Sequence, residues 1–432
     1  MKLNKLSAAI CLSLPLTLLS AQLPADDWDD PWGDESDSSS LNLHGFYELG
    51  AGGRLYRDPL LGRDMTLGEG RARFELSDFI GETRWSLKTD LYADGVEDKQ
   101  RIDLREALLD FRVGDNVDVR LGQQVLTWGT GDMLFLNDLF AKDWQSYFSG
   151  REDEYLKAPS TSARVSYFTD VANLDLVWTP EFTADRYIKG DRFSYFSPMT
   201  GEQMAAPDGR IRPVTRDRWG RESQWAARLY GTHEATEWAF YAYRGYWTQP
   251  VGMDARGEAF FPRLDAYGAS IRAPLAGGIA NAEIAWYEGS DSRGDNPAIP
   301  NDQLRFLVGY DRELMPNFNA AVQYYLEWTQ DYAALKSSWP LPNGRYLPDE
   351  YRHLFTLRLT QRLRQDNLTL SLFTYWSPSD EDYFIRPSVN YRIDDAWALT
   401  VGGNIFGGNK PHTFFGQFED ASNLYVRLRY SY

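Results

Sequence analysis

The chain has 432 residues, with 43% hydrophobic, 25% charged and 15% aromatic content, a formal net charge of −17 and one cysteine. Its mean hydropathy of −0.50 excludes a bundle of transmembrane helices, and its negative charge argues against a general nucleic-acid-binding protein. A single cysteine excludes disulfide frameworks, cysteine-based zinc sites and CxxC redox chemistry. The length suits two or three soluble domains, or one large barrel.

Residues 1–21 have the pattern of a secretory signal peptide. Lys2 and Lys5 precede the apolar run 6–19, and small residues follow up to Ala21, the expected last residue of the signal. A membrane anchor is the alternative, but the apolar run is too short to span a bilayer.

Residues 22–40 form an acidic segment with seven Asp or Glu residues and no Lys or Arg. This composition predicts a periplasmic segment that is disordered when free. A solubilising spacer is the simplest interpretation. Trp28 and Trp32 keep open two other roles, docking of a periplasmic partner and plugging of a channel.

Residues 41–432 alternate between apolar and polar side chains in segments of about ten residues. For example, Val117, Val119 and Leu121 alternate with polar residues or glycine. A period of two gives one apolar and one polar face, which predicts strands. We expect an all-β transmembrane antiparallel barrel of eighteen strands, centred near residues 46, 72, 88, 108, 122, 166, 176, 228, 241, 268, 284, 307, 323, 357, 371, 387, 401 and 427.

The connections between these segments alternate in length. Short ones include 114–116, 232–236 and 365–367. Short turns on the periplasmic side and long loops outside are typical of bacterial outer-membrane barrels, so both termini are expected to be periplasmic. The long connections run near 129–161, 180–222, 248–262, 289–301 and 330–350.

Aromatic residues support a membrane position. Tryptophans such as Trp85, Trp225 and Trp376 lie at strand ends on the apolar face, where headgroup depth suits them. The final strand, Leu424–Tyr432, has alternating apolar residues and a terminal aromatic. It resembles the sorting signal read by the outer-membrane assembly machinery. Lipid and that machinery are therefore the expected partners.

The polar face of the strands is expected to line the lumen, where fifteen basic residues oppose nine acidic ones. An Arg-rich wall favours anions, because guanidinium groups bind carboxylate or phosphate bidentately. Strands that become neighbours on closure carry most of the excess, with only Glu75 opposing it. The alternative is that Arg–carboxylate pairs merely brace the wall. The predicted pore-lining residues are Arg71, Arg73, Arg120, Arg358, Arg386, Arg392, Arg427 and Arg429.

The long connection 129–161 is unusually apolar for a surface loop. Because such a loop is costly in water, we expect it to fold inward and narrow the pore. The alternative is a loop that docks a partner. The predicted constriction residues are Phe135, Asn137, Asp138 and Trp144.

Enzyme function is not expected. The strand assignment separates His44, His233, His353 and His412, so they cannot form a metal site or a triad. Motifs for hydrolases, metalloproteases and nucleotide-binding proteins are absent from the sequence in suitable context. We therefore predict no catalytic residues, no metal and no cofactor.

One stretch carries a family resemblance. Residues Leu121–Gly129, read LGQQVLTWG and followed by Asn137 and Asp138, are similar to strands of alginate-export-like porins and related uncharacterised Gram-negative outer-membrane barrels. Those proteins usually have Gly-Arg-Gln where this chain has Gly-Gln-Gln. The resemblance implies an eighteen-stranded barrel over 41–432 with an Arg-rich lumen, and an anionic sugar or small carboxylate as solute.

The sequence thus predicts a passive, porin-like channel of the outer membrane with an anion bias. The alternative is a non-conducting barrel that assists the assembly or export system of a periplasmic or inner-membrane partner, recruited through residues 22–40.

Overall fold

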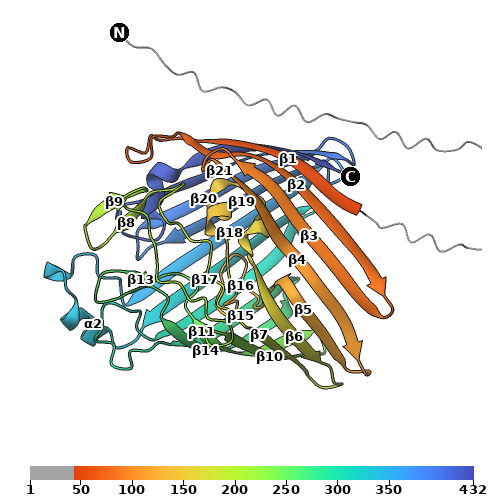
Figure 1. Cartoon of the computed structure of the whole chain (residues 1–432), viewed down its shortest axis with the longest axis horizontal. Helices are drawn as coiled ribbons and strands as arrows, with labels where there is room; N and C mark the ends of the chain where they lie inside the picture. Colours follow the sequence, from red (N-terminus) through yellow and green to blue (C-terminus); the bar gives the residue numbers. More distant parts are fainter. Residues whose placement is uncertain (1–42) are drawn as a thin grey trace, which may run out of the picture. The chain divides into compact units, whose positions relative to one another are not determined.

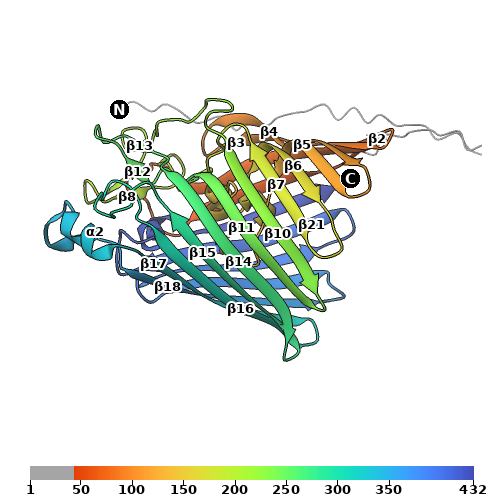
Figure 2. The same cartoon turned by 90° about the horizontal axis from the view of Figure 1, so that it is seen from below.

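The structure is a computed structural model, and it describes residues 43–432. The predicted signal peptide (1–21) and acidic segment (22–40) lie outside the described residues. Figures 1 and 2 show slanted strands around a closed wall. The eighteen barrel strands are β1 (Leu43–Arg54), β2 (Met65–Ile80), β3 (Thr83–Asp94), β4 (Lys99–Val113), β5 (Val117–Val125), β6 (Pro159–Tyr167), β7 (Asn173–Thr179), β10 (Gln224–His233), β11 (Thr236–Tyr246), β14 (Arg263–Leu275), β15 (Gly278–Glu288), β16 (Gln303–Met315), β17 (Phe318–Thr329), β18 (Tyr351–Leu363), β19 (Leu368–Ser377), β20 (Asp382–Arg392), β21 (Trp397–Gly408) and β22 (Asn423–Ser431).

Each barrel strand pairs antiparallel with its neighbours in the chain, and β1 pairs with β22 to close the barrel. The closing register runs from Phe46 opposite Ser431 to Arg54 opposite Asn423. The prediction of eighteen strands is confirmed, and every predicted centre lies within a barrel strand. Closure removes the free edges that an open sheet exposes.

The two ends of the barrel differ. At one end the connections are short turns such as 114–116 and 276–277, and the C-terminus lies there (Figure 1). The other end carries the long loops. These contain the small elements α1 (Trp144–Ser149), η1 (Asp153–Leu156), β8 (Tyr195–Ser197), β9 (Glu202–Met204), β12 (Gly252–Met253), β13 (Ala259–Phe260), α2 (Tyr332–Ser338), η2 (Pro342–Gly344) and η3 (Gly416–Ala421).

The predicted alternation of loop length is incomplete, because connections 95–98 and 378–381 are short although they lie at the long-loop end. In the first, the Asp94 side chain accepts hydrogen bonds from the backbone of Val96 and Glu97, which closes a tight turn. Among residues 43–432, no helix is long and apolar enough to cross a membrane.

The outer face of the wall is apolar. Leu49, Phe240, Ile284 and Val401 are examples of large side chains that remain exposed there. The last strand presents Leu424, Val426 and Tyr430 to the same face, as its alternation predicts. A continuous apolar surface around a closed barrel is the surface that hydrocarbon requires.

Candidate functional site

The connection between β5 and β6, residues 126–158, folds into the barrel instead of lying over its mouth. Tyr147, Phe148 and Leu136 are each only 1% exposed, and they belong to one cluster with wall residues such as Phe384 and Leu307. The yellow helical turns inside the barrel in Figure 1 belong to this loop. We call residues 126–158 the transverse loop, because it contacts opposite walls.

Local sequence shapes the transverse loop. Asp143 caps α1 by accepting a hydrogen bond from the Ser146 backbone N–H at 2.8 Å. Gly150 ends the helix in the left-handed conformation, with φ of 88°. A Cβ at Gly150 would lie 2.2 Å from the ring of Tyr425, so the glycine also permits close approach to β22.

On one side the loop is held by β15, β17 and β18. The Glu283 carboxylate accepts hydrogen bonds from the backbone of Thr130 and Gly131 and, at 2.7 Å, from Asn137 Nδ2. Arg358 donates to Asp132 at 2.8 Å. One wall carboxylate therefore fixes both ends of the stretch 130–137.

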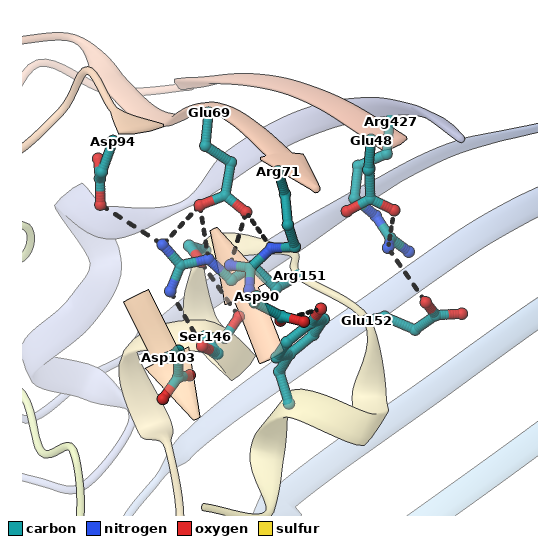
Figure 3. Close-up of polar contacts among 12 residues, drawn as sticks. Glu48, Glu69, Arg71, Asp90, Asp94, Asp103, Ser146, Arg151, Glu152 and Arg427 are labelled. Atoms are coloured by element: carbon teal, nitrogen blue, oxygen red, sulfur yellow. Dashed lines mark hydrogen bonds and ion pairs between the residues drawn. The ribbon is translucent and has the colours of Figure 1, made fainter. Parts of the chain in front are cut away.

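On the other side the loop is held by β2 and β3 (Figure 3). Arg151 donates to Glu69 at 2.7 and 2.9 Å, and Glu69 also pairs with Arg71 at 3.1 Å. Arg71 in turn bonds Asp90 at 2.6 Å, and the Tyr155 hydroxyl donates to the same carboxylate at 2.7 Å. This network is almost fully buried.

Further ion pairs link the acidic run 152–154 of the loop to the same side of the barrel. Arg73 bonds Glu154 at 2.7 Å, and Arg386 bonds Asp153 at 2.9 Å. Glu152 lies against both Arg427 and Arg429, which also share Glu48 of β1. Figure 3 shows Arg427 between Glu48 and Glu152.

Two loop groups show how the network sets protonation. Burial alone lowers the pKa of Arg151, but the charges of Glu69 and Asp143 outweigh burial, and the pKa is raised. Burial raises the pKa of the Tyr155 hydroxyl, so this group stays protonated and donates a hydrogen bond to Asp90.

The sequence predicted that the lumen arginines on neighbouring strands, here called the arginine ladder, have almost no opposing acid. That prediction is wrong. Arg71, Arg73, Arg427 and Arg429 pair with inward carboxylates of β1–β3, and Arg358 and Arg386 pair with the transverse loop. Arg120 pairs with Asp110 at 2.8 Å. Arg392 is exposed at the short-turn end and has no ion pair within residues 43–432. The role of these eight residues as pore lining stays a prediction, while their pairing indicates that most of them hold the loop or brace the wall.

The four residues predicted to form the constriction all lie on the transverse loop. Asn137 bonds Glu283, and Asp138 pairs with Lys142 of the same loop at 2.9 Å. The rings of Phe135 and Trp144 pack edge to face, with their centroids 6.3 Å apart. Trp144 Nε1 donates to Asp185 of the next long loop at 2.9 Å.

Among the described residues, three sizeable cavities border the transverse loop, two along β14–β18 and one, of about 350 Å³, beside β3 and β4. The outer cavity, about 390 Å³, lies toward the long loops and reaches Arg352 of β18. The inner cavity, also about 390 Å³, lies toward the short turns and reaches Tyr310 of β16. Phe135 and Asp138 line both the outer and the inner cavity, so these residues lie between the two spaces. Within residues 43–432, neither of these two cavities has a lining residue from β1–β3 or β20–β22.

Sequence reasoning missed the inward acids Glu48 and Glu69. Glu69 has the same strand parity as Arg71, so the alternation contained the signal. The pairing of Glu152 and Asp153 with distant strands had no sequence signal, because it depends on how the loop folds.

The four histidines lie on different elements, in β1, β10, β18 and the loop before η3. In the part of the chain that the structure describes, no group of His, Cys, Asp and Glu is arranged to hold a metal ion.

Comparisons with solved structures agree with this architecture. OccK11 (OpdR) of Pseudomonas aeruginosa is 11% identical, with a TM-score of 0.52 over 90% of this chain and 95% of its own. OccAB4 of Acinetobacter baumannii is 8% identical, with a TM-score of 0.54 over 91% and 99%. The fold is thus that of Gram-negative outer-membrane porin-like barrels, as the sequence predicted.

No curated protein matches the sequence. The family described as "Protein of unknown function (DUF1302)" matches residues 81–432. Of the two resemblances that the sequence suggested, this match bears out the uncharacterised barrels. Because the match covers well over half of the chain, the protein belongs to the DUF1302 family.

Proposed function

We propose that the protein is a porin-like channel through which small solutes cross the outer membrane by passive diffusion. The observation that carries the proposal is the outer and inner cavities along β14–β18, which are separated only by the part of the transverse loop that contains Phe135 and Asp138. A barrel that served only as a docking platform has no need for cavities that reach toward both ends of the lumen.

The proposed route follows β14–β18. It enters the outer cavity among the long loops, passes Phe135, and leaves through the inner cavity near the short turns. Asp138 is neutralised by Lys142, so the narrow point carries an aromatic ring beside a compensated charge. In this proposal the short turns and both termini face the periplasm.

We also propose a preference for anions, on residues other than the predicted ladder. Lys157 lines the inner cavity and donates only to the Thr127 hydroxyl, at 2.7 Å. Arg272 lines the same cavity, and its ion pair with Glu237 is long, at 3.9 Å. Of the acids there, Asp132 and Asp138 are neutralised by ion pairs. The third acid, Asp311, is exposed and has no ion pair within residues 43–432, so Lys157 and Arg272 leave an excess of one positive charge facing a solute.

Planar-bilayer conductance tests the proposal, with Phe135→Ala as the informative variant. Truncating this ring enlarges the space between the outer and the inner cavity, so single-channel conductance should rise above that of the unaltered protein. Phe240→Ala is the matched control, because that ring is 58% exposed on the outer face of the wall. Absence of conductance in both the unaltered protein and Phe135→Ala would reject the channel and favour a partner-binding barrel.

A further inference from the structure

The outer cavity has walls that a path for small hydrophilic solutes does not need. They are largely aromatic, and Phe135, Trp144, Trp247 and Phe414 are only half-buried there. These rings come from the transverse loop, from the loop after β11 and from the loop before β22. Apolar surface left facing water inside a lumen is unfavourable, and an apolar ligand removes that cost by covering it.

Two hydrogen-bond donors in the same cavity lack an acceptor. Trp247 Nε1 and Arg352 Nη2 are buried, and neither has a partner among the described residues. A buried donor without an acceptor is costly, and natural structures rarely keep one without a reason. An oxygen atom that a bound molecule inserts against these enclosed N–H groups would satisfy them.

The neighbours of both donors hold them in place. Trp247 stacks on Tyr287 with ring centroids 5.6 Å apart, and the Arg305 guanidinium lies 4.0 Å from the Tyr287 ring. Arg352 bonds Asp380 at 2.6 Å and lies 5.5 Å from the Phe414 ring. A rigid donor set loses little entropy when a ligand binds.

Most charged residues of the cavity are compensated by ion pairs, and the exception within residues 43–432 is Asp185, whose carboxylate accepts hydrogen bonds from the Lys142 backbone N–H and from Trp144 Nε1. Arg305 pairs with Glu327 at 3.3 Å, Lys142 with Asp138 at 2.9 Å, and Arg352 with Asp380. A ligand is therefore not selected by a large net charge. What the walls offer is ring surface together with unpaired N–H groups.

We propose that the outer cavity is a binding site for an amphipathic ring compound, with an apolar aromatic or alicyclic body and at least one oxygen acceptor. The volume of about 390 Å³ lies within the range of small-molecule sites. The proposal rests on the proposed function only in that the site would select what enters the channel.

Isothermal titration calorimetry of the full-length protein in detergent tests the site with three probes. These are 2-naphthol, 2-naphthoate and sucrose. Both naphthalene compounds should bind saturably, because each offers ring surface and an oxygen, and sucrose should not. Binding of 2-naphthoate alone would overturn the claim that the charges are compensated, and binding of sucrose alone would overturn the site.

Trp247→Phe keeps the ring and removes the N–H donor, so the affinity for 2-naphthol should fall about 3- to 10-fold. Phe414→Ala removes ring surface and should weaken both naphthalene probes. Trp225→Phe is the matched control, since Trp225 is 54% exposed on the outer face and reports only partition into detergent. Heat-modifiable electrophoresis verifies that each barrel is folded.

Equal affinity in Trp247→Phe, Phe414→Ala and Trp225→Phe would overturn the site. This test of the binding site is independent of the test of the channel. A conducting protein that binds neither naphthalene probe would lose only the site, while a non-conducting protein that binds both would lose only the channel.

Discussion

Two walls of the barrel treat the transverse loop differently. The wall of β1–β3 and β20–β22, here the arginine wall, meets the loop through ion pairs. Arg151–Glu69 is buried, and in Arg386–Asp153 the arginine is buried while the carboxylate is partly exposed. The wall of β14–β18, here the cavity wall, holds the loop at a few points and leaves two cavities between them. Arginine on the strands of the arginine wall thus serves to fix the loop, while the two cavities of the proposed route lie along the other wall.

The difference has an energetic basis. Each charge buried at the arginine wall needs its partner, because an unpaired ion in a dry environment is strongly unfavourable. Arg151 and Tyr155 of the loop supply partners to the buried carboxylates of Glu69 and Asp90, which ties the loop to this wall. At the cavity wall the contacts are aromatic contacts, hydrogen bonds to Glu283 and the partly exposed ion pair Arg358–Asp132, and such contacts tolerate displacement at lower cost.

The largest expected effect comes from breaking the arginine wall with Arg151→Ala. This change leaves the buried carboxylates of Glu69 and Asp94 without one of their cations. Removing one partner of a buried pair costs about 3–5 kcal/mol, enough to release the loop from that wall. We expect higher and noisier single-channel conductance and new protease cleavage within residues 126–158.

Arg112→Ala is the control for that experiment. Arg112 also pairs with a carboxylate, Asp118 at 2.7 Å, but its side chain is 63% exposed. An exposed pair contributes little to stability, so conductance and cleavage should stay as in the unaltered protein. Identical behaviour of the Arg151 and Arg112 variants would contradict the pinning role of the arginine wall.

A smaller effect is expected from loosening the cavity wall with Glu283→Gln. The amide keeps one acceptor oxygen for Thr130 and Gly131, but it turns an N–H toward Asn137 in place of the second oxygen. The stretch 130–137 should move at one end, giving a modest rise in conductance. Glu288→Gln, on an exposed residue of the same strand, supplies the same chemical change away from the loop. An equal response of both variants would argue against Glu283 as an anchor.

The strand pattern was accessible from the sequence because lipid imposes it. Every membrane-facing position must be apolar, so alternation such as that of Leu424, Val426 and Tyr430 marks the strands without knowledge of contacts. The inward course of the transverse loop was also predictable, since its aromatic residues are too many for a solvated loop.

The ion pairs were not accessible in the same way. Parity places Arg386 in the lumen, but its partner Asp153 lies 233 residues earlier, on a loop whose path is set by tertiary packing. A count of strand charges alone therefore overestimated the free positive charge. Side-chain parity gives the face of a residue, and only the folded loop gives its partner.

The smallest expected effect is on ion selectivity. It is measured by comparing an arginine that lines a cavity with an arginine that lines none. Arg272 lines the inner cavity, whereas Arg392 is exposed at the short-turn end and lines neither cavity. Replacing either by Gln removes one positive charge and keeps most of the side-chain volume. If the route follows the cavity wall, Arg272→Gln should shift the reversal potential in a KCl gradient toward the value for cation selectivity, and the shift should be larger than that of Arg392→Gln. Adding Lys157→Gln to Arg272→Gln should enlarge the shift, because both charges face the inner cavity.

Salt concentration completes this test. The side chain of Arg272 is 47% exposed, so mobile ions screen it, and the Debye length falls from about 10 Å at 0.1 M to about 3 Å at 1 M. The difference between the two variants should therefore shrink at high salt. A larger shift from Arg392→Gln than from Arg272→Gln would contradict the proposed route. It would mean that ions pass along the arginine wall, where Arg392 lies, and not along the cavity wall.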